Sequence, residues 1–570
     1  MKLSLRTISR AAIVVAFFLA DGKVHQGQQT LDFSKLTEDF VYGSLALSPV
    51  SATQAGYHEH AGVRLDERLD DFSPAGIEKE RKFYAGFHDR LAAIDPRSLS
   101  VEDRADYQII QNAIDLSLLD LREIQGYRHN PTIYVELVGN ALFNPFVLEY
   151  APLDTRYGHI IQRLSAVPTL MEQAKKDLID SPEVWNRVAR EENDGNIDLI
   201  DKTLRERVPA NRKQDFEKAA GPAMDSLRAF NAYLKDVLSK KTSDWRLGKE
   251  RYAKKFAFTL VAGKTPEQVL SEAEAALQDT REKMAKLAAP LSTREALDEI
   301  AKQHTTPDAF MDEAQKDLAE ATAFVKEKHL VTLPARNNLR VIPTPEFMRG
   351  IYGVAGFNPA PALEPQLGAF YWVTPIPKEW PQARIDSKLR EYNRYGLMQI
   401  SVHEAMPGHY VQFEVADNLE PKSRRALRNI YGNGPYVEGW AFYTQLMMSE
   451  QGFMNNSKEL WLTYYKQALR AIANAILDIR LQTMGMTDEQ AMNLMVNDTF
   501  QEKEEATAKL QRAQLSSCQL PMYFVGLRGW LDTREEYKKS KGAAFQLSQF
   551  HDAALKESAV PLPALGPLLK

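Results

Sequence analysis

The sequence lacks the features of a disulfide-stabilised protein and of a nucleic-acid-binding protein. It has one cysteine, Cys518, among 570 residues, so no disulfide can form within the chain. We expect Cys518 to be a small packing residue rather than a nucleophile. The formal net charge is −5, which gives no excess of basic residues and argues against a nucleic-acid partner. The 44% hydrophobic content is enough for a large core, so stability is expected to come from packing.

Long apolar runs are also missing, apart from one near the N-terminus. Residues 11–20, AAIVVAFFLA, are apolar and follow the basic residues Lys2, Arg6 and Arg10. This run is too short to span a bilayer and matches the core of a signal peptide. We predict a signal peptide over residues 1–20, cleaved near Ala20, and a periplasmic or secreted protein without stable membrane insertion. An uncleaved anchor is the alternative, and the lack of a cysteine after the run argues against a lipoprotein.

The rest of the chain divides into three predicted parts. Residues 21–35 are polar and are predicted to be a disordered mature N-terminus. Residues 36–330 form an N-terminal helical region, with helix-face spacings such as Ile110, Ile114 and Leu118. Residues 331–570 form the catalytic region, and we expect the two regions to make one body around a cleft.

The predicted fold class is mainly α (α+β), a large helical protein with a small β-sheet beside the catalytic helix. The segment 331–381 is rich in proline, and its run Ala369 to Thr374 is predicted to be a strand. Pro375 and Pro377 follow this run and indicate an edge strand, which could pair with an extended substrate or simply pack on the catalytic helix. Helical patterns then cover residues 384–414, 436–452, 458–484 and 488–513.

A candidate metal site follows an apolar stretch in the catalytic region. His403 and Glu404 are followed by His409, six residues after the first histidine. In an unbroken helix this spacing would place the two imidazoles roughly 120° apart, so they would not converge on one ion. Pro407 and Gly408 lie between them and permit a break that could bring His409 back. Two histidines that only pack in a helix–break–helix are the alternative.

The third metal ligand is expected to be a carboxylate on a following helix. Glu438 lies in the first turns of a predicted helix that begins near Gly434. Glu450 is on the same helix but about 18 Å further along, so it cannot take the same position. We therefore predict one Zn²⁺ per chain, held by His403, His409 and Glu438, with a fourth position left open as in catalytic zinc sites.

Several of these motifs resemble the bacterial family catalogued as domain of unknown function 885. They are HEAMPGHYVQ, EGWAFYTQLMMSE, LDIRLQTMGMTDEQA and FHDAAL, together with the early VSATQAGYHEHAGVRLDERLDDFS. The resemblance runs from about residue 40 to the C-terminus and implies a zincin-like fold. It implies that His403, His409 and Glu438 are the metal ligands and that Glu404 is the general base. Many relatives have histidine at the position of Gln482, so any role of a histidine there does not carry over.

A zinc peptidase also needs a donor for the oxyanion that forms on the attacked carbonyl. We consider Tyr523, Arg512 and His551 as candidates for this catalytic role. A half-buried tyrosine, a surface arginine and a capping histidine are the ordinary alternatives. A carboxypeptidase would need a cation for the terminal carboxylate, and Arg512 could supply it. An aminopeptidase would need acidic groups beside the metal, and the sequence does not choose between the two.

The predicted function is zinc-dependent hydrolysis, in a metallopeptidase that cleaves short peptides with metal-activated water. One alternative is a metal-dependent hydrolase that cleaves an amide or ester of a non-peptide metabolite. Another is a non-catalytic periplasmic binding protein with a structural zinc. Glu404 argues against a structural zinc, because closed structural sites fill four protein positions and need no free carboxylate beside a ligand. The expected partner is a peptide or small-molecule substrate, and the oligomeric state is not predicted.

Overall fold

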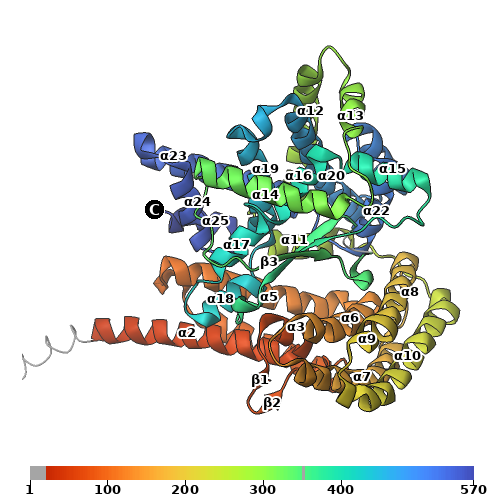
Figure 1. The fold of residues 1–570 in the computed structure, drawn as a ribbon. Coiled ribbons are helices and arrows are strands. Elements are labelled where there is room, and N and C mark those ends of the chain that lie inside the picture. The colour runs from red at the N-terminus through yellow and green to blue at the C-terminus, as the bar shows by residue number, and fades with distance from the viewer. Residues whose placement is uncertain (1–20, 350–352) are drawn as a thin grey trace, which may run out of the picture.

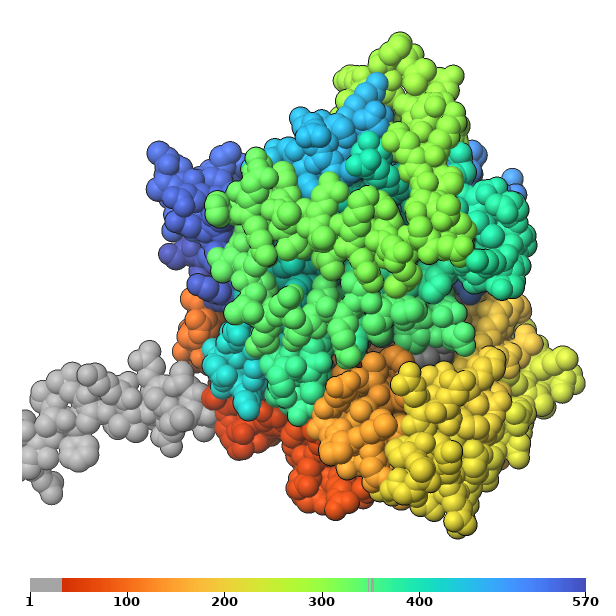
Figure 2. Space-filling view, in the orientation of Figure 1, coloured from red at the N-terminus to blue at the C-terminus, as the bar shows by residue number. Residues whose placement is uncertain are grey.

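Helices make up most of this protein, and the computed structural model describes residues 21–349 and 353–570 (Figure 1). The predicted signal peptide, residues 1–20, lies outside the described residues. In the view of Figure 1 the helices up to Asp236 lie in the lower part, and those of residues 266–328 lie above them with most of the later helices. The space-filling view shows the same division on one face of the molecule (Figure 2).

The N-terminal region is helical with one short hairpin, as its hydrophobic periodicity predicts. Its elements are α2 (Asp21–Leu47), α3 (Pro49–Ala55), β1 (Glu59–His60), β2 (Val63–Arg64), α4 (Pro74–Ala92), α5 (Val101–Leu119), α6 (Thr132–Val147), α7 (Leu153–Asp177), α8 (Glu183–Asp198), α9 (Arg205–Arg207), α10 (Lys213–Asp236), α11 (Gly248–Leu260), α12 (Pro266–Ala288), α13 (Thr293–Ala301) and α14 (Phe310–Lys328).

The prediction of disorder over residues 21–35 differs from the structure, which places them in α2. Phe33 and Leu36 are buried in the same apolar cluster as Phe40. These residues are spaced three and four apart, so one face of α2 packs against the body of the protein. The residues before Phe33 are mostly polar, and composition alone therefore predicts disorder for the start of α2.

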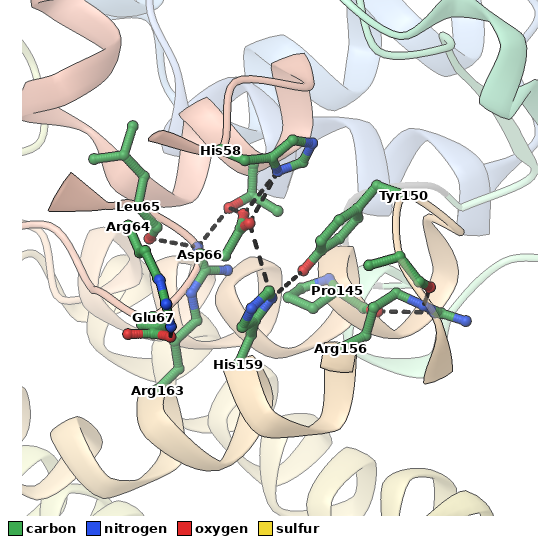
Figure 3. Close-up of polar contacts among 12 residues, drawn as sticks. His58, Arg64, Leu65, Asp66, Glu67, Pro145, Tyr150, Arg156, His159 and Arg163 are labelled. Carbon is green, nitrogen blue, oxygen red and sulfur yellow. Dashed lines mark hydrogen bonds and ion pairs between the residues drawn. The ribbon is translucent and has the colours of Figure 1, made fainter. Parts of the chain in front are cut away.

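A partly buried polar cluster joins the segments beside the hairpin to α7 (Figure 3), and through Glu364 it reaches the loop between β4 and β5. The carboxylate of Asp66 is 3.0 Å from Nδ1 of His58 and 3.8 Å from Nδ1 of His159. The other ring nitrogen of His58 is 3.0 Å from Glu364, and Tyr150 hydrogen-bonds to His159. These contacts connect segments far apart in the sequence and position the chain that leads into the sheet.

The three-stranded sheet has the order β3–β5–β4 and is formed by β3 (Leu339–Pro343), β4 (Ala355–Asn358) and β5 (Ala369–Val373). Strand β5 pairs in parallel with β3 and antiparallel with β4. The prediction that the Ala369–Thr374 run is an edge strand is therefore wrong, because this strand is central. Pro375 and Pro377 follow the strand and end it without occupying either of its pairing edges.

The small sheet lies beside the predicted catalytic helix, as expected. The hydroxyl group of Tyr371 on β5 is 3.0 Å from the hydroxyl group of Ser401 on that helix. Trp372 is buried among residues of the N-terminal region, including Phe143. The aromatic residues of β5 therefore pack on both of its faces and do not present an edge to a substrate.

The helices after the sheet match the sequence patterns in part. They are α15 (Gln382–Glu391), α16 (Arg394–Glu404), α17 (His409–Ala416), α18 (Lys422–Ile430), α19 (Gly434–Glu450), α20 (Lys458–Thr483), α21 (Asp488–Asn493), α22 (Lys503–Leu515), α23 (Met522–Lys541), α24 (Leu547–Lys556) and α25 (Leu562–Leu568). The predicted helices 436–452 and 458–484 are confirmed. Those predicted over 384–414 and 488–513 are each interrupted, the first at Tyr392 and again after Glu404.

The apolar core crosses the predicted boundary between residues 330 and 331. Tyr252 and Phe256 of α11 belong to the same buried cluster as Leu469 and Ile472 of α20. The two predicted regions are thus packed against each other through their interiors. Among the described residues, none of the helices has the length and apolar character needed to cross a bilayer.

Candidate metal centre

The two histidines converge because the helix that carries the first one stops between them. Helix α16 begins at the cap residue Asn393, whose side chain accepts hydrogen bonds from two backbone amides. It ends at Glu404, and α17 begins at His409. The imidazole centroids of His403 and His409 are 4.8 Å apart with their planes at 85°. The break that the sequence permits between the histidines is therefore present.

Gly408 is required by the geometry of this break. Its backbone amide donates a hydrogen bond to the carbonyl oxygen of Val402 at 3.0 Å. A Cβ at this position would lie 1.9 Å from the carbonyl oxygen of His403 and 2.4 Å from that of Val402. The indole of Trp440 donates to the carbonyl oxygens of Pro407 and Gly408 at 3.0 and 3.1 Å. Close packing and these hydrogen bonds hold the turn and place His409.

Glu438 completes a group of three ligand atoms. It lies in the first turns of α19, which is capped by Asn433. Its Oε2 atom is 3.4 Å from Nε2 of His403 and 3.6 Å from Nε2 of His409. The ligand atoms of all three residues lie within 4.8 Å of one another. Within the described part of the chain, no other group of three or more histidine, cysteine, aspartate or glutamate side chains is arranged so that it could hold a metal ion.

The distances in this group fit a metal ion better than direct hydrogen bonds. Tetrahedral zinc with bonds of about 2.0–2.1 Å separates its ligand atoms by about 3.3–3.4 Å. Hydrogen bonds between nitrogen and oxygen are about 2.7–3.2 Å long. The Oε2 atom of Glu438 is buried and has no hydrogen-bond partner among the described residues, although buried carboxylates normally have one. Two imidazoles and one carboxylate are also a common ligand set of catalytic zinc sites.

The charges in the group keep Glu438 in its ionised form. Burial disfavours the charged form of Glu438, but the imidazoles of His403 and His409 overcome it and hold the pKa of this carboxyl well below its usual range. Burial likewise opposes a charge on His409, and Glu438 followed by Glu404 raises its pKa above the ordinary value. A buried carboxylate next to two imidazoles is thus ionised where a divalent cation would bind.

Glu404 lies next to the group without belonging to it. It follows His403 directly at the end of α16, and its side chain lines a cavity of about 120 Å³ together with His403 and Tyr523. The metal-ligand group consists of the other three residues alone. Glu404 therefore lies beside the three-residue group and lines the same cavity as His403.

Tyr523 reaches this space because two helices cross in backbone contact. A Cβ on Gly439 of α19 would lie 2.6 Å from Cα of Gly526 on α23. Glu438 is next to the first glycine, and Tyr523 lies one turn before the second. The ring of Tyr523 stacks on the ring of His403 with centroids 6.2 Å apart. Burial, and then the nearby Glu438, raises the pKa of Tyr523, so its phenol keeps the proton that it could donate.

Arg512, a catalytic candidate from the sequence, also lines the cavity and donates to Gln519 at 3.2 Å. Two further cations of the cavity wall, Lys509 and Arg470, were not predicted from the sequence. Lys509 could have been recognised, because it lies among small apolar residues on the buried face of α22, three residues from Arg512. A lysine on the apolar face of a helix indicates a special environment.

His551 does not belong to the site, which corrects the prediction that it is catalytic. It is buried in the core, where its Nδ1 donates to the carbonyl oxygen of Leu330 at 2.7 Å. Its Nε2 is 2.9 Å from the hydroxyl oxygen of Tyr443, and its ring contacts Trp440. Burial lowers the pKa of His551 to about 4, so the neutral form is favoured. Both ring nitrogens therefore have partners in the core, where His551 supports packing.

Gln482 has a similar structural role. Its Oε1 accepts a hydrogen bond from the amide of Leu247 at 2.8 Å, and its Nε2 donates to the carbonyl oxygen of Ser516 at 3.3 Å. The side chain connects α20 to two loops and is not among the residues that line the cavity at the metal group. The departure from histidine at this position leaves the three-ligand group unchanged.

Comparisons with known proteins identify a family whose function is open. The family described as "Bacterial protein of unknown function (DUF885)" matches residues 49–568. A solved structure described as a putative lipoprotein of unknown function from Shewanella oneidensis is 30% identical, with a TM-score of 0.77, and the match covers 94% of this chain and 99% of that chain. A putative lipoprotein from Colwellia psychrerythraea is 17% identical, with a TM-score of 0.77 and coverage of 94% and 98%. No curated protein matches the chain.

Proposed function

Since the chain belongs to the DUF885 family of bacterial proteins of unknown function, we propose from its own side chains that it is a zinc-dependent metallopeptidase that cleaves short peptides. The observation that carries this proposal is the convergence of His403, His409 and Glu438, with Oε2 of Glu438 3.4 and 3.6 Å from the Nε2 atoms of the two histidines. The neighbouring Glu404 and the open cavity favour a catalytic centre over a structural one, because three protein ligands leave one position open.

The residues around the group have separate expected roles in hydrolysis. A zinc ion bound here would polarise the substrate carbonyl and lower the pKa of a water molecule to about 7. Glu404 takes a proton from the attacking water and delivers it to the nitrogen of the leaving amine. Tyr523 donates a hydrogen bond to the oxygen of the attacked carbonyl, where negative charge develops. In the balanced reaction, the peptide C–N bond breaks and a new C–O bond forms from water.

The size of the cavity favours short substrates. Its volume of about 120 Å³ is smaller than the ~300–1,000 Å³ of pockets that hold drug-sized ligands. Strand β5, which the sequence offered for pairing with an extended chain, is central and has no free edge of its own. A short peptide or a small molecule is therefore the expected substrate, and folded proteins are not.

We also propose that the protein is exported and acts in the periplasm or outside the cell. The apolar run in residues 11–20 supports this proposal. The similar structures from Shewanella oneidensis and Colwellia psychrerythraea are both described as putative lipoproteins, which is compatible with export. Cleavage near Ala20 belongs to the same proposal.

The test is hydrolysis by the purified chain of short peptides, of non-peptide amides and esters, and of a folded protein. We expect cleavage of short peptides, loss of cleavage after removal of metal by a chelator, and recovery when zinc is added. Cleavage of the non-peptide compounds alone would replace the peptidase proposal with the metabolite hydrolase. A zinc-loaded protein that cleaves none of these substrates would contradict the proposed function.

A further inference from the structure

Lys509 is a buried cation without the partner that such a cation normally has. It is 7% exposed and lines the same cavity as His403, Glu404 and Tyr523. Among the described residues, no carboxylate oxygen lies within 4.0 Å of its ammonium group. An unpaired buried charge is costly, so this arrangement needs an explanation.

The other buried lysines of the described chain show the usual arrangement. Lys388 is 3.3 Å from Glu505, and Lys466 is 2.8 Å from Glu391. Lys509 differs from both, although it is buried to a similar extent and lies on the same helix as Glu505. The absence of a paired carboxylate is therefore particular to the lysine that faces the cavity.

The surroundings of Lys509 concentrate positive charge in the cavity. Arg512, one turn away on α22, and Arg470 on α20 line the same space. Burial, followed by these two guanidinium groups, lowers the pKa of Lys509 well below its usual range. Arg470 is 3.6 Å from Glu391 and so has a carboxylate nearby. An anion in the cavity would interact favourably with Lys509 and Arg512 and would restore the charge of the lysine.

We propose that Lys509 and Arg512 bind a carboxylate of the substrate beside the metal group, and that this is the α-carboxylate of a C-terminal residue. This inference rests on the proposed function and makes the enzyme a carboxypeptidase. The cavity of about 120 Å³ resembles in size the ~150 Å³ cavities that hold a benzene molecule, which suits a single terminal residue.

Two neutral side chains of the cavity wall support a peptide ligand. The Oδ1 atom of Asn474 and the Oε1 atom of Gln445 are buried and have no hydrogen-bond partner among the described residues. Both side chains are 3% exposed. Acceptors of this kind suit the N–H groups of a peptide backbone. The cavity thus combines cations for a carboxylate with acceptors for an amide.

The direct test measures binding of N-acetylalanine and N-acetylalanine amide by calorimetry, with metal-free and zinc-loaded full-length protein. We expect the acid to bind at least about tenfold more tightly than the amide in both metal states, since hydrogen bonds to charged groups contribute about 1.5–3 kcal/mol. Lys509→Met should remove most of this preference, because methionine keeps the length of the side chain without its charge. Lys503→Met, at an exposed lysine of α22, is the control and should retain the preference.

Equal binding of the acid and the amide by the wild-type protein would overturn the inference, as would an unchanged preference in Lys509→Met. A third ligand, N-acetylglutamate α-amide, carries its carboxylate on the side chain. Binding of this ligand as tight as that of N-acetylalanine would overturn the assignment to the C-terminus. We expect Lys509→Met to fold with an unchanged or higher melting temperature, since it removes an unpaired buried charge.

A kinetic test separates this inference from the proposed function. Zinc-loaded protein should cleave a short peptide acid with a higher kcat/KM than the matched peptide amide, and Lys509→Met should lower kcat/KM for the acid by about 10- to 100-fold. Cleavage without any acid preference would overturn the inference and leave the peptidase proposal standing. A binding preference for the acid without any cleavage would contradict the peptidase proposal and would leave only the carboxylate-binding role of Lys509 and Arg512 standing.

Discussion

Replacing Glu404 by glutamine is expected to lower kcat by about 10²–10⁴, the usual contribution of a positioned acid–base group. Glutamine keeps the size of the side chain and its capacity for hydrogen bonds, but it cannot take a proton from water. Glu404 is outside the three-ligand group, so the zinc content should stay at the wild-type level. The measurement is steady-state hydrolysis of a short peptide together with metal analysis of the same sample.

A matched control comes from the carboxylate that the helix geometry excluded as a ligand. Glu450 lies at the end of α19, where it pairs with Arg534 at 2.7 Å. Glu450→Gln should therefore keep both zinc and activity. Loss of zinc in Glu404→Gln would show that Glu404 is a ligand. Full activity with zinc retained would place the chemistry on another residue.

The second large effect is expected at Gly408, where alanine should disrupt the metal group. A methyl group there would lie 1.9 Å from the carbonyl oxygen of His403, so the backbone between the two histidines would have to move. Overpacking of this kind costs about 1–3 kcal/mol of stability. Because His409 follows directly, we expect at least about a hundredfold loss of zinc affinity, the upper range for lost support of a metal ligand.

The control for Gly408→Ala is an alanine at a glycine that has free space. Gly86 lies on the exposed side of α4, and a Cβ there would meet no atom within 4 Å. Gly86→Ala should keep the zinc affinity and should stabilise the helix slightly, because alanine favours helical backbone. Zinc titration and thermal melting of both variants make the comparison. Wild-type zinc affinity in Gly408→Ala would show that the turn tolerates a side chain and would contradict this account of the site.

The convergence of His403, His409 and Glu438 could be predicted from the sequence because these residues are separated by short, interpretable segments. The six-residue spacing of His403 and His409 excluded a continuous helix, and Pro407 with Gly408 indicated where it breaks. The sequence showed only that a break was permitted. That Gly408 is required follows from the approach of two carbonyl oxygens, which no local pattern reveals.

Residues brought to the cavity from separate helices were harder to predict. Tyr523, Arg512 and His551 were the three candidates from the sequence, with Tyr523 ranked first. The crossing of α19 and α23 at two glycines places Tyr523 at the site, whereas His551 is held in the core by Tyr443 and a backbone carbonyl. Such long-range packing leaves little trace in local periodicity.

The sheet illustrates a different limit. Strand β5 was located from its β-branched and aromatic residues, but the prolines that follow it indicated an edge position. Strand pairing joins residues distant in sequence, and β5 lies between β3 and β4. Prolines beyond the end of a strand therefore indicate the residue at which the strand ends, but they do not indicate whether the strand is central or at an edge of the sheet.

The zinc content of the purified protein tests the central claim most directly. The three-ligand group predicts roughly one zinc per chain in the wild type and a small fraction of that in His409→Ala, which lacks one ligand. His304→Ala, at an exposed histidine, is the control and should keep the wild-type content. A wild-type protein that neither carries nor takes up zinc, or equal zinc in the wild type and His409→Ala, would contradict the assignment.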